Sequence, residues 1–283
     1  MILSLSHQAL WNFSTSTFLN VAKDYFRGVE LVDEPRLFSW ELEDNLQPVK
    51  EKLSTMDMRV TLHAAYRDLN ISSTIPPVRS LSIELINRSI DKAAELNAEV
   101  VTVHPGKMSG RKIDKADAEM LLVESLDKIC KHAEERNVKV ALENMTPGPK
   151  KLCQTPEDFL NILSKVNSSA LGICVDFSHV HLMKYRPDKF VEPIKKHIIN
   201  VHLSDSAADE DHLYLGGGMI DVEEIFELLG DIGYTRSCVL EFWFPKDPLE
   251  GLLKSAKTVR EAFDKIEQKR LAPPKKAKTS SRK

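Results

Sequence analysis

Eight short apolar runs recur along the chain, separated by longer stretches in which apolar residues return every three or four positions. The runs cover residues 2–6, 28–32, 59–63, 100–104, 139–143, 172–176, 199–203 and 238–242. Several are continuously apolar, such as VVTV and GICV, and this pattern is typical of strands buried on both faces of a parallel sheet. The sequence therefore predicts eight buried strands.

The stretches between the runs predict amphipathic helices, most clearly over 81–96 and 116–133. Thr155 and Asp221 each precede an apolar face and have an acidic residue three positions on, which predicts helix N-caps. Alternating strands and helices predict an α/β fold. Eight repeats favour a single-domain (β/α)8 TIM barrel over 1–268. An open doubly wound sheet is disfavoured because no GxGxxG follows the first strand.

Composition and cysteine usage indicate the cellular compartment to expect. No apolar run approaches the ~18 residues that a membrane helix needs, and the N-terminus lacks the basic region of a signal peptide. The four cysteines, Cys130, Cys153, Cys174 and Cys238, form no CxxC pair. They are expected to be reduced thiols in a soluble cytoplasmic protein without a membrane partner.

Charge is unevenly distributed along the chain. Seven of the 39 basic residues and no acidic ones lie in 269–283, which leaves 32 against 42 acidic residues over 1–268, a net charge of -10. The basic segment has two prolines and little apolar content, so we expect a disordered tail. Such a tail is either a solvated terminus or a weak, salt-sensitive contact with nucleic acid or another anionic surface.

The predicted strands three to eight each carry a metal-capable side chain at the carboxyl end. These are His63, His104, Glu143, Asp176, His202 and Glu241, with His179 three residues beyond Asp176. In such barrels these ends form one mouth, where the active site lies. Six ionisable groups in one narrow mouth would repel one another, and a divalent cation would remove that cost.

The ligand types narrow the choice of metal. Glu143, Asp176, His202 and Glu241 offer three oxygens and one nitrogen, which suits Mn, Mg or Co and also Zn. Four further histidines would favour Zn at a second or third site. They are His63, His104, His179 and His212.

An ordered set of short motifs carries a family resemblance. The motifs are HAAY at 63–66, HPG at 104–106, EN at 143–144, DFSH at 176–179, HLSDS at 202–206, HLYLGGG at 212–218 and the final Glu241. Together they resemble the xylose-isomerase-like TIM barrels, which include sugar phosphate isomerases and epimerases and also endonuclease IV.

The resemblance implies two possible ligand sets. In the epimerase branch, the residues matching Glu143, Asp176, His202 and Glu241 hold one metal. The two glutamates also exchange protons with the substrate, and the residue matching His179 binds the substrate. The endonuclease branch holds three zinc ions with these residues and an acid two positions before the last histidine. Its further ligands would be His63, His104, His179, His212 and Glu210, or Asp209 if the loop is shifted.

The sequence also departs from the family patterns. The residues before His212 lack the DRH pattern of the endonucleases, and the usual GEG is replaced by Gly216, Gly217 and Gly218. No arginine follows shortly after His202, where some ketose epimerases carry one. The first departure argues against the endonuclease hypothesis, and the last argues against a specificity for free ketoses.

Three functions remain to be weighed. The favoured one is a metal-dependent sugar or sugar phosphate isomerase or epimerase, in which Glu143 and Glu241 move a proton through an enediolate held by the metal. Substrate contacts would come from His179, His63, Lys107 and Trp243, with Phe244 beside the last. An endonuclease IV-like phosphodiesterase acting at abasic sites is disfavoured by the acidic body.

A non-catalytic metal-binding barrel is disfavoured too, because the mouth offers more candidates than the four ligands of a closed structural site. The partner expected is a small sugar rather than nucleic acid. Whether copies of the chain form a homo-oligomer is left open.

Overall fold

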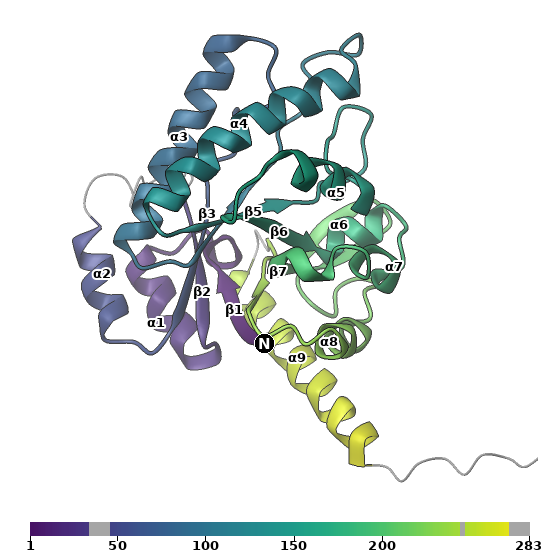
Figure 1. The fold of residues 1–283 in the computed structure, drawn as a ribbon. Coiled ribbons are helices and arrows are strands. Elements are labelled where there is room, and N and C mark those ends of the chain that lie inside the picture. Colours follow the sequence, from purple (N-terminus) through teal and green to yellow (C-terminus); the bar gives the residue numbers. More distant parts are fainter. Residues whose placement is uncertain (34–45, 244–246, 272–283) are drawn as a thin grey trace, which may run out of the picture.

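Eight parallel strands form a closed barrel in the computed structural model, which describes residues 1–33, 46–243 and 247–271 (Figure 1). They are hydrogen-bonded in the order β1-β10-β7-β6-β5-β4-β3-β2. The strands are β1 Ile2–Ser6, β2 Gly28–Val32, β3 Arg59–His63, β4 Val100–Val103, β5 Lys139–Glu143, β6 Leu171–Asp176, β7 Ile198–Leu203 and β10 Ser237–Leu240. The predicted TIM barrel is confirmed.

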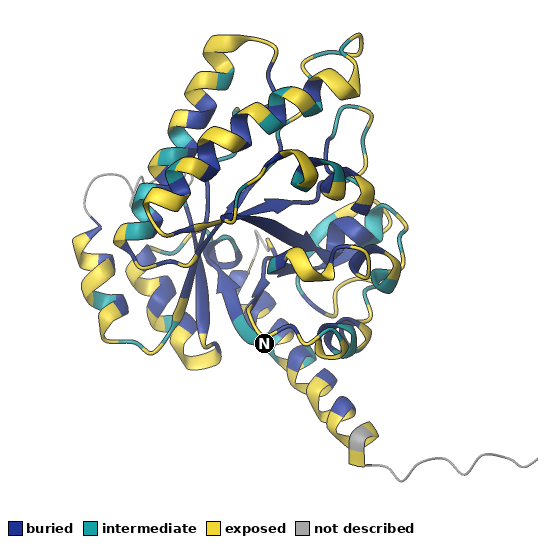
Figure 2. Cartoon of the chain, in the orientation of Figure 1, coloured by how far each residue is buried: buried dark blue, intermediate teal, exposed yellow. Residues whose placement is uncertain are grey.

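Helices surround the barrel and turn their apolar sides toward it, so that burial follows their inner faces (Figure 2). They are α1 Thr15–Tyr25, α2 Gln47–Ser54, α3 Pro76–Glu95, α4 Lys115–Glu135, α5 Pro156–Lys165, α6 Phe177–Leu182, α7 Pro187–Val191, α8 Val222–Asp231 and α9 Pro248–Leu271, with short 3-10 turns η1 His7–Leu10 and η2 Lys195–His197. Both predicted caps form, because the side chains of Thr155 and Asp221 accept the expected backbone N–H groups.

A short antiparallel hairpin follows β7, and the sequence analysis did not predict it. It consists of β8 Asp205–Ala207 and β9 Glu210–Leu213. The buried Asp205 carboxylate accepts the backbone N–H groups of Gly216 and Ile220, and so anchors the loop after the hairpin. The backbone N–H of Trp243 donates to the backbone carbonyl of His212 at 2.7 Å, which links the hairpin to the segment that follows β10.

The C-terminal helix is longer than expected. Residues 269–271 lie in α9, and the Lys269 ammonium pairs with Glu223 and Glu227 on α8. The rest of the predicted tail, 272–283, lies outside the described residues. None of the described helices is long and apolar enough to cross a membrane.

All four cysteines are free and buried. Burial raises the pKa of each thiol, to about 12 for Cys130 and Cys238 and further for Cys153 and Cys174. All four are free thiols, as expected from the sequence.

Candidate metal centre

Four of the predicted ligands converge at the carboxyl end of the barrel, here called the barrel mouth. Ligand atoms of Glu143, Asp176, His202 and Glu241 all lie within 4.8 Å of one another, and all four side chains are buried. Glu143 and Asp176 end β5 and β6, His202 is on β7, and Glu241 follows β10 directly. Adjacent strands of one closed sheet therefore deliver this four-residue group.

The two glutamates meet at one nitrogen of His202. Its Nδ1 lies 3.0 Å from Glu143 Oε1 and 2.7 Å from Glu241 Oε2. The backbone positions the group further, because Asn144 Oδ1 accepts the Asp176 N–H at 2.7 Å and Asn144 Nδ2 donates to the Asp176 carbonyl. The two hydrogen bonds with Asn144 therefore hold the backbone of Asp176 in place at the barrel mouth.

Unsatisfied oxygens indicate that this group fits a cation. Glu143 Oε2 and Asp176 Oδ2 are buried and accept no hydrogen bond from the described residues. Leaving such carboxylate oxygens without a partner is costly, and a divalent ion would satisfy both. Three carboxylates and one imidazole nitrogen are donors that Mn, Mg, Co and Zn accept.

A second group lies beside the first and shares Glu143 with it. Glu143 Oε2 is 2.9 Å from His104 Nε2 and 3.5 Å from His63 Nε2. The His63 Nδ1 contacts the Ala64 carbonyl at 2.8 Å, which leaves Nε2 directed at the glutamate. His63, His104 and Glu143 form a candidate metal-binding set of their own.

A third group shares Asp176 and contains His179 and His212. The Nδ1–H of His179 donates to the Asn144 carbonyl at 2.7 Å. Asp211 lies at the edge of this group, 3.8 Å from His179 Nε2 and 3.4 Å from His212 Nδ1. The structure does not bring Glu210 there: it is exposed on β9 and belongs to none of the groups.

Electrostatic coupling keeps the two glutamates ionised without a cation. Burial alone would raise their pKa values, but the charges and hydrogen bonds of the histidines, His202 first, hold both well below the usual range. The pKa values of His63, His202 and His212 are raised, whereas burial lowers that of His104. Burial would lower the pKa of His63, but its close contact with Glu143 and the negative charges of Glu241 and Glu143 raise it to about 9.

Two predicted substrate contacts lie on the rim. Trp243 is half-exposed, and its ring centroid lies 6.2 Å from that of Trp11. Lys107 is exposed on the loop after β4, where the Asn70 side chain bonds both its backbone N–H and its carbonyl, at 2.9 and 2.8 Å. Phe244 lies outside the described residues.

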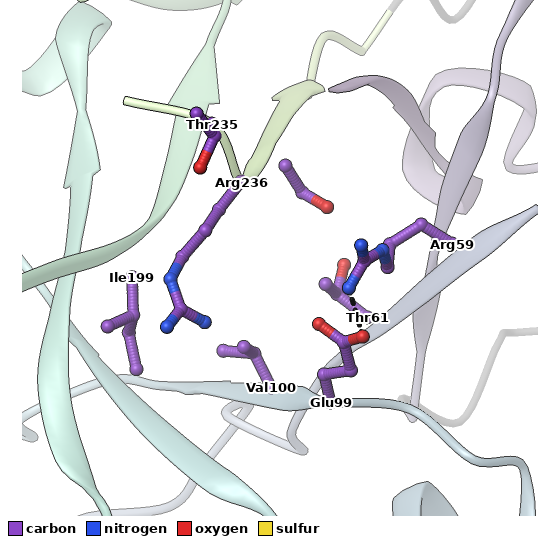
Figure 3. Close-up of a pocket in the computed structure, with 8 residues that line it drawn as sticks. Arg59, Thr61, Glu99, Val100, Ile199, Thr235 and Arg236 are labelled. Atoms are coloured by element: carbon purple, nitrogen blue, oxygen red, sulfur yellow. Dashed lines mark hydrogen bonds and ion pairs between the residues drawn. The ribbon is translucent and has the colours of Figure 1, made fainter. Parts of the chain in front are cut away.

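The opposite end of the barrel has a pocket of its own, of about 350 Å³ (Figure 3). It lies between the starts of β3, β4, β7 and β10, where Arg59 pairs with Glu99 and Arg236 points inward from the other side. None of the predicted ligands lines it. Among the described residues, the candidate metal-binding groups lie at the barrel mouth and not at this pocket.

Sequence reasoning missed three groups that contact these ligands. They are Asp211, the Cys174 thiol, which forms a further set with Glu143 and His202, and the fully buried Glu30. Glu30 had a visible signal, because it is the one charged residue in the otherwise apolar strand GVELV. Asp211 adjoins His212 in sequence, but its relevance depends on how the hairpin turns.

Comparison with known proteins identifies the family. The family model for the xylose isomerase-like TIM barrel matches residues 19–267. The chain belongs to this family. It is 29% identical over 274 residues to an uncharacterized protein of Methanocaldococcus jannaschii, covering 91% of each chain. It is also 26% identical over 206 residues to a probable endonuclease 4 of Mycoplasma capricolum, covering 67% of this chain and 69% of that one.

Solved structures with this fold include sugar epimerases. A D-tagatose 3-epimerase-like protein superposes with a TM-score of 0.84 at 29% identity, covering 95% of this chain and 99% of the other. An L-ribulose 3-epimerase superposes with a TM-score of 0.82 at 17% identity, covering 97% and 99%. At that lower identity the likeness concerns the fold alone.

Proposed function

We propose that the protein is a divalent-metal-dependent isomerase or epimerase of a sugar or sugar phosphate. The observation that carries the proposal is the placement of Glu143 and Glu241 on either side of His202 Nδ1 within a single four-residue ligand group. Two carboxylates next to one cation can act on the same substrate carbon. The structural likeness to a D-tagatose 3-epimerase-like protein supports the same chemistry.

The glutamates would perform the proton transfers. One carboxylate takes the proton from the carbon next to the substrate carbonyl, and the other delivers a proton to that carbon from the opposite face. The carboxylate that takes the proton must start ionised, and the lowered pKa values of Glu143 and Glu241 favour that state at neutral pH. The carboxylate that delivers a proton must first have taken one from solvent, so the two glutamates exchange protonation states over one turnover. A bound cation would supply Lewis-acid polarisation of the carbonyl, which makes the adjacent C–H more acidic.

The surrounding side chains would orient the sugar. His179 uses Nδ1 to bond the Asn144 carbonyl, so its ring is held with Nε2 available to the mouth. Trp243 offers a half-exposed ring on which a sugar face can pack. Lys107 could meet a phosphate or hydroxyl group, and His63 could contact substrate where no second cation occupies its group.

A second candidate is an endonuclease IV-like phosphodiesterase. The two additional ligand groups favour it, because a multinuclear site can stabilise both attacking and leaving oxygens of a phosphodiester. The probable endonuclease 4 relatives point the same way. The net charge of -10 over residues 1–268 opposes it, since duplex binding depends on many contacts to phosphates.

One experiment separates the two. Protein reconstituted with Mn, Co, Mg or Zn is incubated with ketoses and ketose phosphates, and in parallel with a duplex containing an abasic site. We expect metal-dependent conversion of a ketose substrate and slow or no strand incision. Efficient incision that a chelator abolishes and zinc restores, without conversion of any ketose, would contradict the proposal.

A further inference from the structure

A polar layer lies directly beneath the ligands, inside the barrel. It consists of Glu30 on β2, Thr61 on β3, Thr102 on β4 and Asn200 on β7, all buried. Interiors of TIM barrels are usually filled by Val, Ile and Leu at this depth. A carboxylate here is costly unless partners satisfy it, so its position calls for a physical explanation.

The layer satisfies one oxygen of Glu30 and leaves the other for the site above. Thr61 Oγ1 donates to Glu30 Oε2 at 3.0 Å, and Asn200 Nδ2 donates to the same atom at 2.9 Å. Oε1 has no hydrogen-bond partner among the described residues. It lies 2.9 Å from Nε2 of His202, both side chains being fully buried.

His202 therefore has different neighbours at its two nitrogens. Nδ1 faces Glu143 and Glu241 in the ligand group, whereas Nε2 lies 2.9 Å from Glu30 Oε1 and 3.4 Å from Asn200 Nδ2. A neutral imidazole that coordinates a cation through one nitrogen carries its proton on the other. With Nδ1 in the ligand group, that proton lies on Nε2, next to the Glu30 carboxylate.

We propose that Glu30 is a positioning residue of the metal centre. Glu30 fixes the His202 ring with the Nε2 proton toward its own carboxylate and Nδ1 toward the cation. It also makes Nδ1 a more basic, stronger ligand of the cation. A carboxylate behind a ligating histidine orients the ring and raises its basicity in just this way. Thr61 and Asn200 in turn hold the carboxylate. The inference rests on the proposed metal site but not on the choice of substrate.

The test compares Glu30→Gln with Thr61→Val. The first keeps the shape of residue 30 but removes the charge, whereas the second removes one hydrogen bond to the carboxylate and leaves the charge in place. Affinities for Mn²⁺ and Zn²⁺ are measured by calorimetry and chelator competition, together with the melting temperature of each metal-free protein. We expect Glu30→Gln to bind both ions roughly 10- to 100-fold more weakly, and Thr61→Val to weaken binding by a smaller factor, because Asn200 still holds the charged carboxylate.

Metal affinity that is unchanged in Glu30→Gln would overturn the inference and make Glu30 a buried filler, even if both variants melt earlier. If Glu30→Gln does not fold, nitrogen NMR of the zinc-loaded wild type decides instead. It should show His202 protonated at Nε2 and bound through Nδ1, and the opposite assignment would overturn the inference. A wild type that binds no divalent ion would overturn the metal site itself, which distinguishes that failure from the others.

Discussion

At the scale of single residues, the barrel mouth concentrates charge that is neutralised only in part. Two buried carboxylate oxygens, on Glu143 and Asp176, have no hydrogen-bond partner among the described residues. Of the four candidate ligands, Glu143 and Asp176 end their strands, Glu241 follows one directly and His202 is the penultimate residue of β7, so the sequence pattern alone could indicate them. Glu30 could not be placed in this way, because its partner Asn200 is 170 residues away. Only closure of the barrel brings Glu30 on β2 next to Asn200 on β7.

Substituting His202→Ala should sharply reduce metal content. His202 supplies the only nitrogen of the four-residue group, and its loss leaves Glu143 and Glu241 facing each other without the imidazole between them. Elemental analysis after dialysis measures the bound metal, with His197→Ala as a control outside the candidate groups. Unchanged stoichiometry in His202→Ala would show that the ligands are assigned incorrectly.

Metal binding should strengthen as pH rises toward about 9. Without a cation the pKa of His63 is raised from 6.5 to about 9, so a proton must leave before this nitrogen can bind a metal. The same shift stabilises the metal-free fold fully below pH 6.5 and is lost as pH rises through about 9. Calorimetry in buffers of different ionisation enthalpy counts the released protons. Binding with no proton release at pH 7 would contradict this coupling.

The third group should depend on Asp211 and not on Glu210. Asp211 lies 3.4 Å from His212 Nδ1, whereas Glu210 is exposed on the same hairpin. Asp211→Asn should lower the number of zinc ions bound under saturating zinc, and Glu210→Gln should leave it unchanged. The two variants are matched controls for each other. The reverse result would mean that the hairpin turns differently when metal is bound.

At the scale of elements, prediction succeeded where the signal was local. Continuous apolar runs gave the strands, and the caps at Thr155 and Asp221 formed as expected. Helix α3 begins earlier than the apolar pattern indicated, with two prolines in its first turn. The β8–β9 hairpin is built from polar residues around the buried Asp205, and a hydrophobic pattern cannot reveal such an element.

Gly218→Ala should disturb the loop that anchors this hairpin. A Cβ there would lie 2.5 Å from both Asp205 Oδ1 and the Ser206 carbonyl oxygen, too close for either to remain in place. We expect a loss of about 1–3 kcal/mol in unfolding free energy and weaker binding at the third group. Gly110→Ala is the control, because its nearest atom would be 3.9 Å away. Equal melting temperatures for both variants would contradict the tight packing.

At the scale of the whole molecule, an acidic barrel ends in a basic segment. The net charge of -10 over residues 1–268 suits a small ligand held within the mouth better than a nucleic acid held along a surface. The predicted start of the tail at residue 269 falls inside α9, which runs to Leu271. Lys269 is basic like the residues after it, and a charge pattern alone cannot show that it pairs with Glu223 and Glu227 on α8.

Removing residues 272–283 should leave the melting temperature almost unchanged. The segment is basic and contains two prolines and no large apolar side chain with which to dock. The full chain and the truncated chain are compared by thermal denaturation, with retention on an anionic resin at several salt concentrations as a second readout. A drop of several degrees would show that the segment packs on the barrel.

In the proposed mechanism, Glu143 and Glu241 transfer protons to and from a sugar carbon at a metal-loaded mouth. The most direct measurement is solvent deuterium exchange into the ketose that the wild type converts, comparing wild type and Glu241→Gln at equal metal content. We predict exchange at the carbon next to the carbonyl in the wild type, and loss of most of it in Glu241→Gln, because an amide cannot act as a base at neutral pH. Conversion of the ketose without deuterium incorporation, or a variant that exchanges as fast as the wild type, would contradict the account.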